Sequence, residues 1–181
     1  MESIKPGSKR LSIISLLCPD PYFYDVEYSR ATVSTWIPDF EFPHEFQADG
    51  EELGHKIDSR IVHIEGTSPN PVGMIINIMA NGQVTNPIIV KLTSGERIKL
   101  GDSIHPFSMQ YGDLVRIITE DGRKNVTLIR DGVEESINQY MSEDSEFFQI
   151  TYGNNAIGYD AGDGVGNISL EILYRNRYEG A

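Results

Sequence analysis

The 181-residue sequence predicts an all-β fold built as an antiparallel sandwich or barrel. No segment longer than about ten residues places apolar side chains at the i, i+3, i+4 spacing of an amphipathic helix. Short runs rich in β-branched and aromatic residues recur instead, and each is bounded by Gly, Pro, Asn or Asp. Two Asp-Gly pairs between such runs indicate hairpin turns.

The expected strands follow one another at short intervals along the chain. In chain order they are 9–17, 27–37, 59–65, 72–80, 87–92, 97–100, 114–119, 124–130, 146–151 and 168–174. Residues 120–123 join two of these strands, and Asp131-Gly132 ends the second. Because an Asp-Gly pair supplies the two positive φ angles of a type I′ turn, we expect an antiparallel meander there.

Residues 18–46 have a different composition. Cys18-Pro19-Asp20-Pro21 places two prolines around an acid, and Tyr22-Phe23-Tyr24 follows directly. Since proline has no N–H for a strand ladder, this stretch is predicted to be a connector. The three aromatic side chains are expected to clamp it onto a neighbouring surface.

The formal net charge of −12 argues against a nucleic acid or an anionic membrane as the main partner. Binding to phosphate groups depends on Lys and Arg, whereas residues 39–52 and 134–163 carry many acids and neither basic residue. The single cysteine excludes an internal disulfide framework and a cysteine-built zinc site.

The N-terminus resembles a lipoprotein signal, because basic residues precede an apolar run that ends at Cys18. The run contains two serines and alternates from Arg10 to Leu16, so a strand is the preferred interpretation. No run approaches the ~20 apolar residues of a membrane helix. We therefore expect synthesis in the cytosol without a secretion signal, and we expect the sequons at Asn125 and Asn167 to be chance matches.

No catalytic, cofactor-binding or metal-binding residue is predicted. The four histidines, His44, His55, His63 and His105, form no metal-ligand spacing, and His63 fits the polar face of a strand. Motifs for a serine hydrolase, a phosphate-binding loop and a dinucleotide fold are missing from the sequence. Cys18 has no neighbouring base and is interpreted as a packed apolar thiol.

Three alternatives stay open at this point. Residues 160–164 superficially match a calcium loop, although a Gly-rich turn is preferred. Paired carboxylates in the acidic stretches would suit glycoside hydrolysis, the least supported hypothesis. Trp36 with Phe40, Phe42 and Phe46 would suit either sugar stacking or packing onto a sandwich or a neighbouring subunit, and packing is preferred.

Several short motifs occur in a fixed order along the chain. They are CPDPYFY (18–24), NPVGMIINI (70–78), Gly82, NPIIV (86–90), GD (101–102), GDLVRI (112–117), KNVTL (124–128), GNN (153–155) and ISLEILYRNRY (168–178). On these motifs the sequence resembles the C-terminal part of the distal tail protein (Dit) family of siphoviruses, the long, non-contractile-tailed phages, and of related prophages. The likeness runs from about residue 10 to the C-terminus.

The resemblance implies a galectin-like antiparallel β-sandwich of the jelly-roll type with an N-terminal connecting strand. It also implies a non-enzymatic virion structural protein of the tail tip or baseplate. Family members form hexameric rings that link the tail tube protein to a tail-associated lysin or fibre, and they carry receptor-binding proteins. The implied location is the virion tail tip after assembly in the host cytoplasm, without a cofactor, nucleic acid or membrane.

The stretch before Pro19 is too short for the family's ring-forming N-terminal domain. Residues 1–24 are therefore expected to be a connecting segment, a remnant of that domain, and residues 25–181 the sandwich domain. An unpaired strand at 9–17 would favour pairing with another copy. The alternative function is a carbohydrate-binding module for adhesion to the host cell wall.

Overall fold

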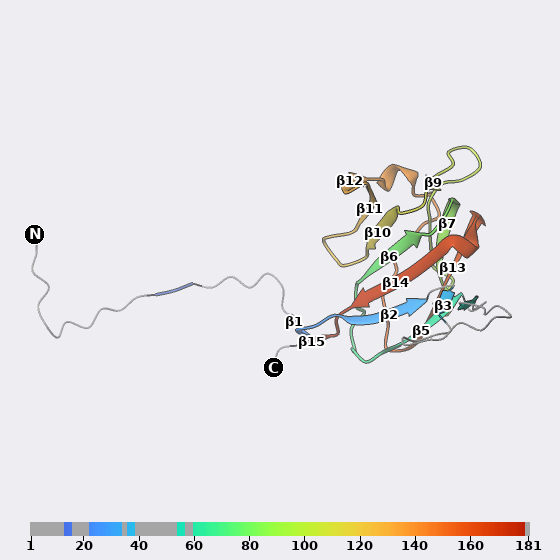
Figure 1. Ribbon diagram of the computed structural model, residues 1–181. Helices are drawn as coiled ribbons and strands as arrows, with labels where there is room; N and C mark the ends of the chain where they lie inside the picture. Colours follow the sequence, from blue (N-terminus) through green and yellow to red (C-terminus); the bar gives the residue numbers. More distant parts are fainter. Residues whose placement is uncertain (1–12, 16–21, 34–35, 39–53, 57–59, 180–181) are drawn as a thin grey trace, which may run out of the picture.

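The computed structural model describes residues 13–15, 22–33, 36–38, 54–56 and 60–179, with backbone only for 36–38 and 54–56. Within this part of the chain, two antiparallel sheets pack face to face as a β-sandwich (Figure 1). The all-β prediction is confirmed, and the two short helices are single 3₁₀ turns: η1 (Asn138–Tyr140) and η2 (Val165–Asn167).

The larger sheet has six antiparallel strands in the order β12-β11-β10-β6-β14-β2. Its strands are β2 (Ser29–Val33), β6 (Met74–Ala80), β10 (Leu114–Ile118), β11 (Asn125–Arg130), β12 (Val133–Ser136) and β14 (Ile168–Tyr174). Alternation along β6 buries Met74, Ile76 and Ile78 and turns Asn77 and Met79 outward. This period of two is what a half-buried strand requires.

The smaller sheet has the order β5-β13-β7-β8, and β9 pairs with β7 beside β8. Its strands are β5 (Ile61–Gly66), β7 (Val84–Lys91), β8 (Arg97–Lys99), β9 (Ser108–Met109) and β13 (Gly153–Asp163). Two ribbons stand apart from these sheets: β1 (Tyr22–Tyr24) pairs with β15 (Arg177–Glu179), and β3 (Trp36–Pro38) pairs with β4 (Gly54–Lys56).

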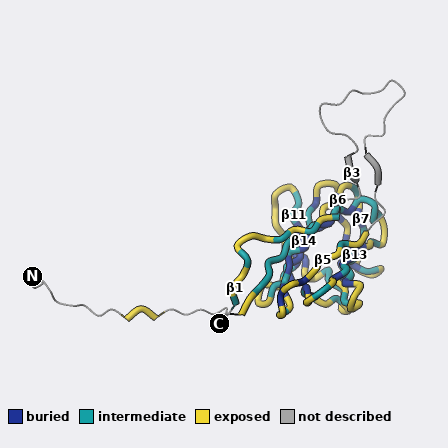
Figure 2. The backbone as a smooth tube through the Cα atoms, turned by 90° about the horizontal axis from the view of Figure 1, so that it is seen from below, coloured by how far each residue is buried: buried dark blue, intermediate teal, exposed yellow. Residues whose placement is uncertain are grey.

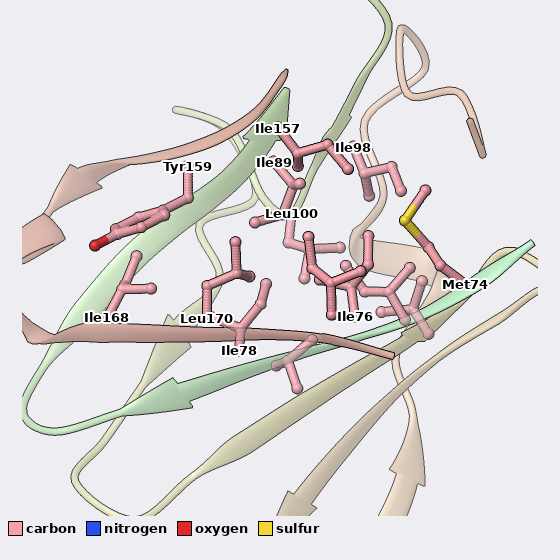
Figure 3. Close-up of a cluster of buried hydrophobic side chains, with 14 of the residues drawn as sticks. Met74, Ile76, Ile78, Ile89, Ile98, Leu100, Ile157, Tyr159, Ile168 and Leu170 are labelled. Carbon is pink, nitrogen blue, oxygen red and sulfur yellow. The ribbon is translucent and has the colours of Figure 1, made fainter. Parts of the chain in front are cut away.

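The hydrophobic core lies between the two sheets (Figures 2 and 3). Ile76, Ile78 and Leu170 reach inward from the larger sheet, and Ile89 and Ile157 reach inward from the smaller one. All five are at most 2% exposed. Full burial of each such side chain contributes about 1.5–3 kcal/mol, so this interface supplies most of the driving force for folding.

The segment 146–151, predicted to be a strand, belongs to neither sheet. Phe148 and Ile150 are buried, which explains the alternating pattern. The backbone makes an isolated bridge between Ile150 and Val72, and the Gln149 carbonyl accepts a hydrogen bond from Lys91. The segment therefore covers the core as a non-strand connection.

Strand β13 was missed by the sequence prediction, and residues 160–163, interpreted as a turn, form its last part. Its Gly and Asn residues disfavour a strand intrinsically. The strand is nevertheless paired on both sides, with β5 along one edge and β7 along the other. The turn begins only at Gly164, whose φ is 74°.

Both predicted hairpins are present, but their turns differ. Asp131 and Gly132 have φ angles of 51° and 79°, as a type I′ turn requires. Between β10 and β11 only Gly122 has a positive φ, and Arg123 N–H donates to Glu120 O at 3.1 Å. The type I′ prediction is therefore wrong for the first Asp-Gly pair.

The predicted strand 27–37 is divided between β2 and β3. Of the predicted strand 9–17, the structure describes only residues 13–15, which lie outside any strand, and Ile13 and Ile14 are exposed. Cys18, Phe40, Phe42 and Phe46 lie outside the described residues.

Candidate docking surfaces

The first candidate surface is the neck, which we define as residues 22–28 together with 175–179. Strand β1 begins the described sandwich and β15 ends it, and the two pair antiparallel with Phe23 opposite Tyr178. In Figure 1 the chain enters and leaves the sandwich at this ribbon. The neck therefore connects the sandwich to whatever precedes Tyr22 in the chain.

Arginine and tyrosine side chains stack at the neck. The Arg175 guanidinium lies 4.4 Å from the Tyr28 ring centre and 5.4 Å from that of Tyr24. Arg177 lies 4.4 Å from the ring centre of Tyr22. The negative faces of the aromatic rings attract the cations, so these contacts hold β1 against the C-terminal residues.

Hydrogen bonds attach the neck to the body of the sandwich. Ser68 Oγ donates to Arg177 O at 2.7 Å, and Asn70 Nδ2 donates to Glu179 at 2.9 Å. Within the neck, Asp25 accepts a hydrogen bond from Asn176 Nδ2 at 2.9 Å and joins the two chain segments, and its hydrogen bond with the Tyr178 phenol raises the pKa of that phenol. The neck is thereby fixed at the end of the sandwich.

The neck also exposes apolar side chains. Phe23, Tyr178 and Val26 are 67%, 46% and 96% exposed. Phe23 and Tyr178 are cross-strand neighbours and share one face of the ribbon. Adjacent exposed aromatic side chains are typical of protein interaction sites.

The outward face of the six-stranded sheet is the second candidate surface. Strand register places a polar row between two largely apolar rows across β10, β6 and β14: Ile118–Ile75–Leu173, Arg116–Asn77–Glu171 and Leu114–Met79–Ser169. Within the polar row, Asn77 Nδ2 donates to Glu171 at 2.8 Å. Arg30 Nε lies 3.1 Å from the same carboxylate. The charge of the Glu171 carboxylate is therefore compensated by partners within the same sheet.

The acidic segment 134–163 carries no Lys or Arg of its own. Three of its acids lie in ion pairs: Glu134 with Arg116 at 3.6 Å, Asp144 with Arg97 at 2.7 Å and Asp160 with Arg60 at 3.8 Å. A hydrogen bond from Ser142 lowers the pKa of Asp144. Part of this charge is therefore compensated by neighbouring strands, and the second acidic stretch, 39–52, lies outside the described residues.

The residues considered for chemistry do not come together in the described chain. His63 is exposed on β5, 3.3 Å from Asn154 Oδ1, and His105 is exposed between β8 and β9. Asp160 lies 3.8 Å from Arg60. Among the described residues, no group of three His, Cys, Asp or Glu side chains is placed to hold a metal ion. The side chains of His44, His55 and Trp36 lie outside those residues.

The sequence prediction assigned no role to Arg175 or Arg177. Two sequence features could have indicated a contact of these arginines with aromatic rings. They are the Arg-Asn-Arg-Tyr motif near the end of a chain with net charge −12 and the aromatic run Tyr22-Phe23-Tyr24 far upstream. Only the pairing of β1 with β15 shows that these two motifs meet.

Fold and surfaces together define an antiparallel β-sandwich whose first and last described strands pair at one neck. No family model matches the chain, and no match to it is found among curated proteins. Among solved structures, the chain is similar to a chain in the structure of the phage P2 baseplate in its activated conformation with Ca, with a TM-score of 0.45 and 10% identity. The similarity covers 88% of this chain and 54% of the other, so the chain spans about half the length of that baseplate protein. No helix among the described residues is long and apolar enough to cross a membrane.

Proposed function

We propose that this chain is a structural component of a phage or prophage tail tip, related to the distal tail proteins, and that it acts without enzymatic chemistry. The observation that supports the proposal best is the pairing of β1 with β15. Tyr22-Phe23-Tyr24, the end of the first motif of the sequence resemblance, and the ending YRNRY lie about 150 residues apart and meet at this ribbon. A module joined at one neck suits a peripheral domain that is held on a ring.

In this proposal the sandwich is a rigid docking platform of the galectin-like type. Its partners are tail-tip proteins: the tail tube protein, a tail-associated lysin or fibre, and a receptor-binding protein. Exposed aromatic side chains at the neck anchor a contact, since such residues dominate binding energy at interfaces. Surface charges select the partner and accelerate encounter more than they add affinity.

The genes that flank this one test the proposal. We expect a tape-measure gene upstream and a lysin-like tail gene downstream. Metabolic genes on both sides would contradict the tail-tip role. Deleting the gene from its phage should give particles without a complete tail tip, as seen by negative-stain electron microscopy, and expressing the chain in trans should restore them.

The alternative function, a carbohydrate-binding module for wall adhesion, makes a different prediction. Glycans of the host cell wall would bind the isolated protein, and Trp36→Ala would abolish the binding. A glycan array with both proteins separates the two functions, because a docking platform is expected to give no specific signal.

A further inference from the structure

Arg175 holds a charge that the described chain leaves without an anionic partner. Its guanidinium contacts the Tyr24 and Tyr28 rings, yet no acidic side chain of the described residues lies within 4.0 Å of it. Its Nε is buried without a hydrogen-bond acceptor. Cation–π contacts occupy the faces of the guanidinium plane and leave the N–H groups at its edge unbound.

Arg177 is only loosely compensated. Its Nη1 lies 3.8 Å from Asp121, beyond hydrogen-bond distance, and its Nε is also buried without an acceptor. Arg175 and Arg177 thus form a site of two guanidinium groups with no carboxylate within hydrogen-bond distance among the described residues, and the neighbouring acids Asp25, Glu27 and Glu179 pair with neither of them. Such a site attracts an anion by charge complementarity.

We propose that the neck binds an extended peptide segment of a neighbouring protein in which acidic residues alternate with apolar ones. A carboxylate of the segment would bind the terminal nitrogens of Arg175, because a planar guanidinium pairs with a carboxylate through two parallel hydrogen bonds. The two tyrosine rings hold the guanidinium in place, which lowers the entropic cost of binding.

Because alternate side chains of an extended segment point to opposite sides, its apolar residues would pack on the exposed pair Phe23 and Tyr178, on the face of the ribbon opposite to Tyr22 and Tyr24, and on Val26. An acidic peptide fits better than a nucleic acid. The excess of acidic residues in the chain repels a polyanion, whereas one or two carboxylates match two arginines. The inference deepens the docking role proposed above and rests on it for the nature of the partner.

Fluorescence anisotropy with the full chain tests this site. The probe is a fluorescein-labelled pentapeptide in which two glutamates alternate with leucine and phenylalanine, and the control peptide carries glutamine at both glutamates. We expect the acidic peptide to bind, the control to bind at least about tenfold more weakly, and added salt to weaken the acidic peptide. Equal binding of both peptides would overturn the proposal.

Variants locate the contact. Arg175→Gln should weaken binding about tenfold or more, and Arg175→Lys should restore only part of it, because lysine keeps the charge but lacks the planar fork. Arg60→Gln is the matched control, since Arg60 is paired with Asp160 on another part of the surface. Phe23→Ser should also weaken binding. Because this substitution leaves the arginine–tyrosine stack intact, it tests the site even if Arg175→Gln unfolds the neck.

Three further results would refute the inference: full affinity in Arg175→Gln, equal losses in Arg175→Gln and Arg60→Gln, or binding of a single-stranded oligonucleotide in preference to the acidic peptide. Failure here would leave the tail-tip role standing, because that role is decided by the gene neighbourhood and by where the chain lies in the particle.

Discussion

Asn155 is the buried side chain whose replacement should destabilise the sandwich most clearly. It is fully buried in β13, and its carboxamide makes five hydrogen bonds. Oδ1 accepts from Thr151 N–H at 2.9 Å and from the Thr151 hydroxyl at 3.0 Å. Nδ2 donates to the carbonyls of Thr151, Gly153 and Ile64 at 2.7, 2.8 and 3.3 Å. This side chain therefore fixes the turn that leads from the core-covering segment into β13.

Asn155→Leu removes all five bonds and leaves backbone groups of Thr151 and Gly153 without partners. Each buried backbone group that loses its partner costs ~1–3 kcal/mol of stability. Because water can reach the exposed Thr151 and satisfy part of this loss, we expect the free energy of unfolding to fall by about 3 kcal/mol in total. For a domain of this size that loss lowers the Tm by roughly 6–12 °C.

Urea unfolding followed by tryptophan fluorescence and circular dichroism measures the loss. Asn154→Leu is the matched control, since Asn154 is the exposed neighbour and its side chain makes one hydrogen bond, with His63, among the described residues. A loss below about 1 kcal/mol in Asn155→Leu, or equal losses in both variants, would refute the structural role assigned to Asn155.

Two other predictions concern stability. Hydrogen bonds from Arg130 lower the pKa of the buried Asp113. The pair therefore stabilises the folded state above about pH 4, where an unfolded aspartate is ionised. This stabilisation is lost as the pH falls through the lowered pKa of Asp113. Asp113→Asn should cost about 2 kcal/mol at pH 7, and the difference from wild type should shrink in acid; a pH-independent difference would contradict this. A Cβ at Gly66 would lie 2.1 Å from Thr151 O, whereas one at Gly158 meets nothing closer than 3.4 Å. Thermal unfolding should therefore show Gly66→Ala strongly destabilised and Gly158→Ala close to wild type, and equal effects would refute the close approach.

Much of the fold could be predicted because local pattern and tertiary pairing agree. In β6 the alternation of Met74, Ile76 and Ile78 with outward residues already marks the core face. The turn at Asp131-Gly132 follows from the φ angles that these residues tolerate. At such positions the local preference of the residues agrees with the tertiary structure, so the periodicity of the sequence alone predicts the strand and its buried face.

The sequence prediction fails where tertiary contacts, not local sequence, determine the backbone conformation. Gly153–Asp163 contains residues that disfavour a strand, and its two neighbouring strands impose the conformation. Segment 146–151 alternates because it covers the core, although it joins no sheet. The neck could not be predicted either, because its two halves lie about 150 residues apart and periodicity carries no information on such a contact.

The position of the chain in an assembled particle tests the central claim most directly. Purified particles of the phage or induced prophage that encodes the chain can be labelled with a gold-conjugated antibody raised against residues 60–179 and examined by electron microscopy. The proposed function predicts gold at the end of the tail distant from the capsid and at no other site. Particles that lack the chain, or that carry the label on the capsid or along the tail tube, would contradict a tail-tip role.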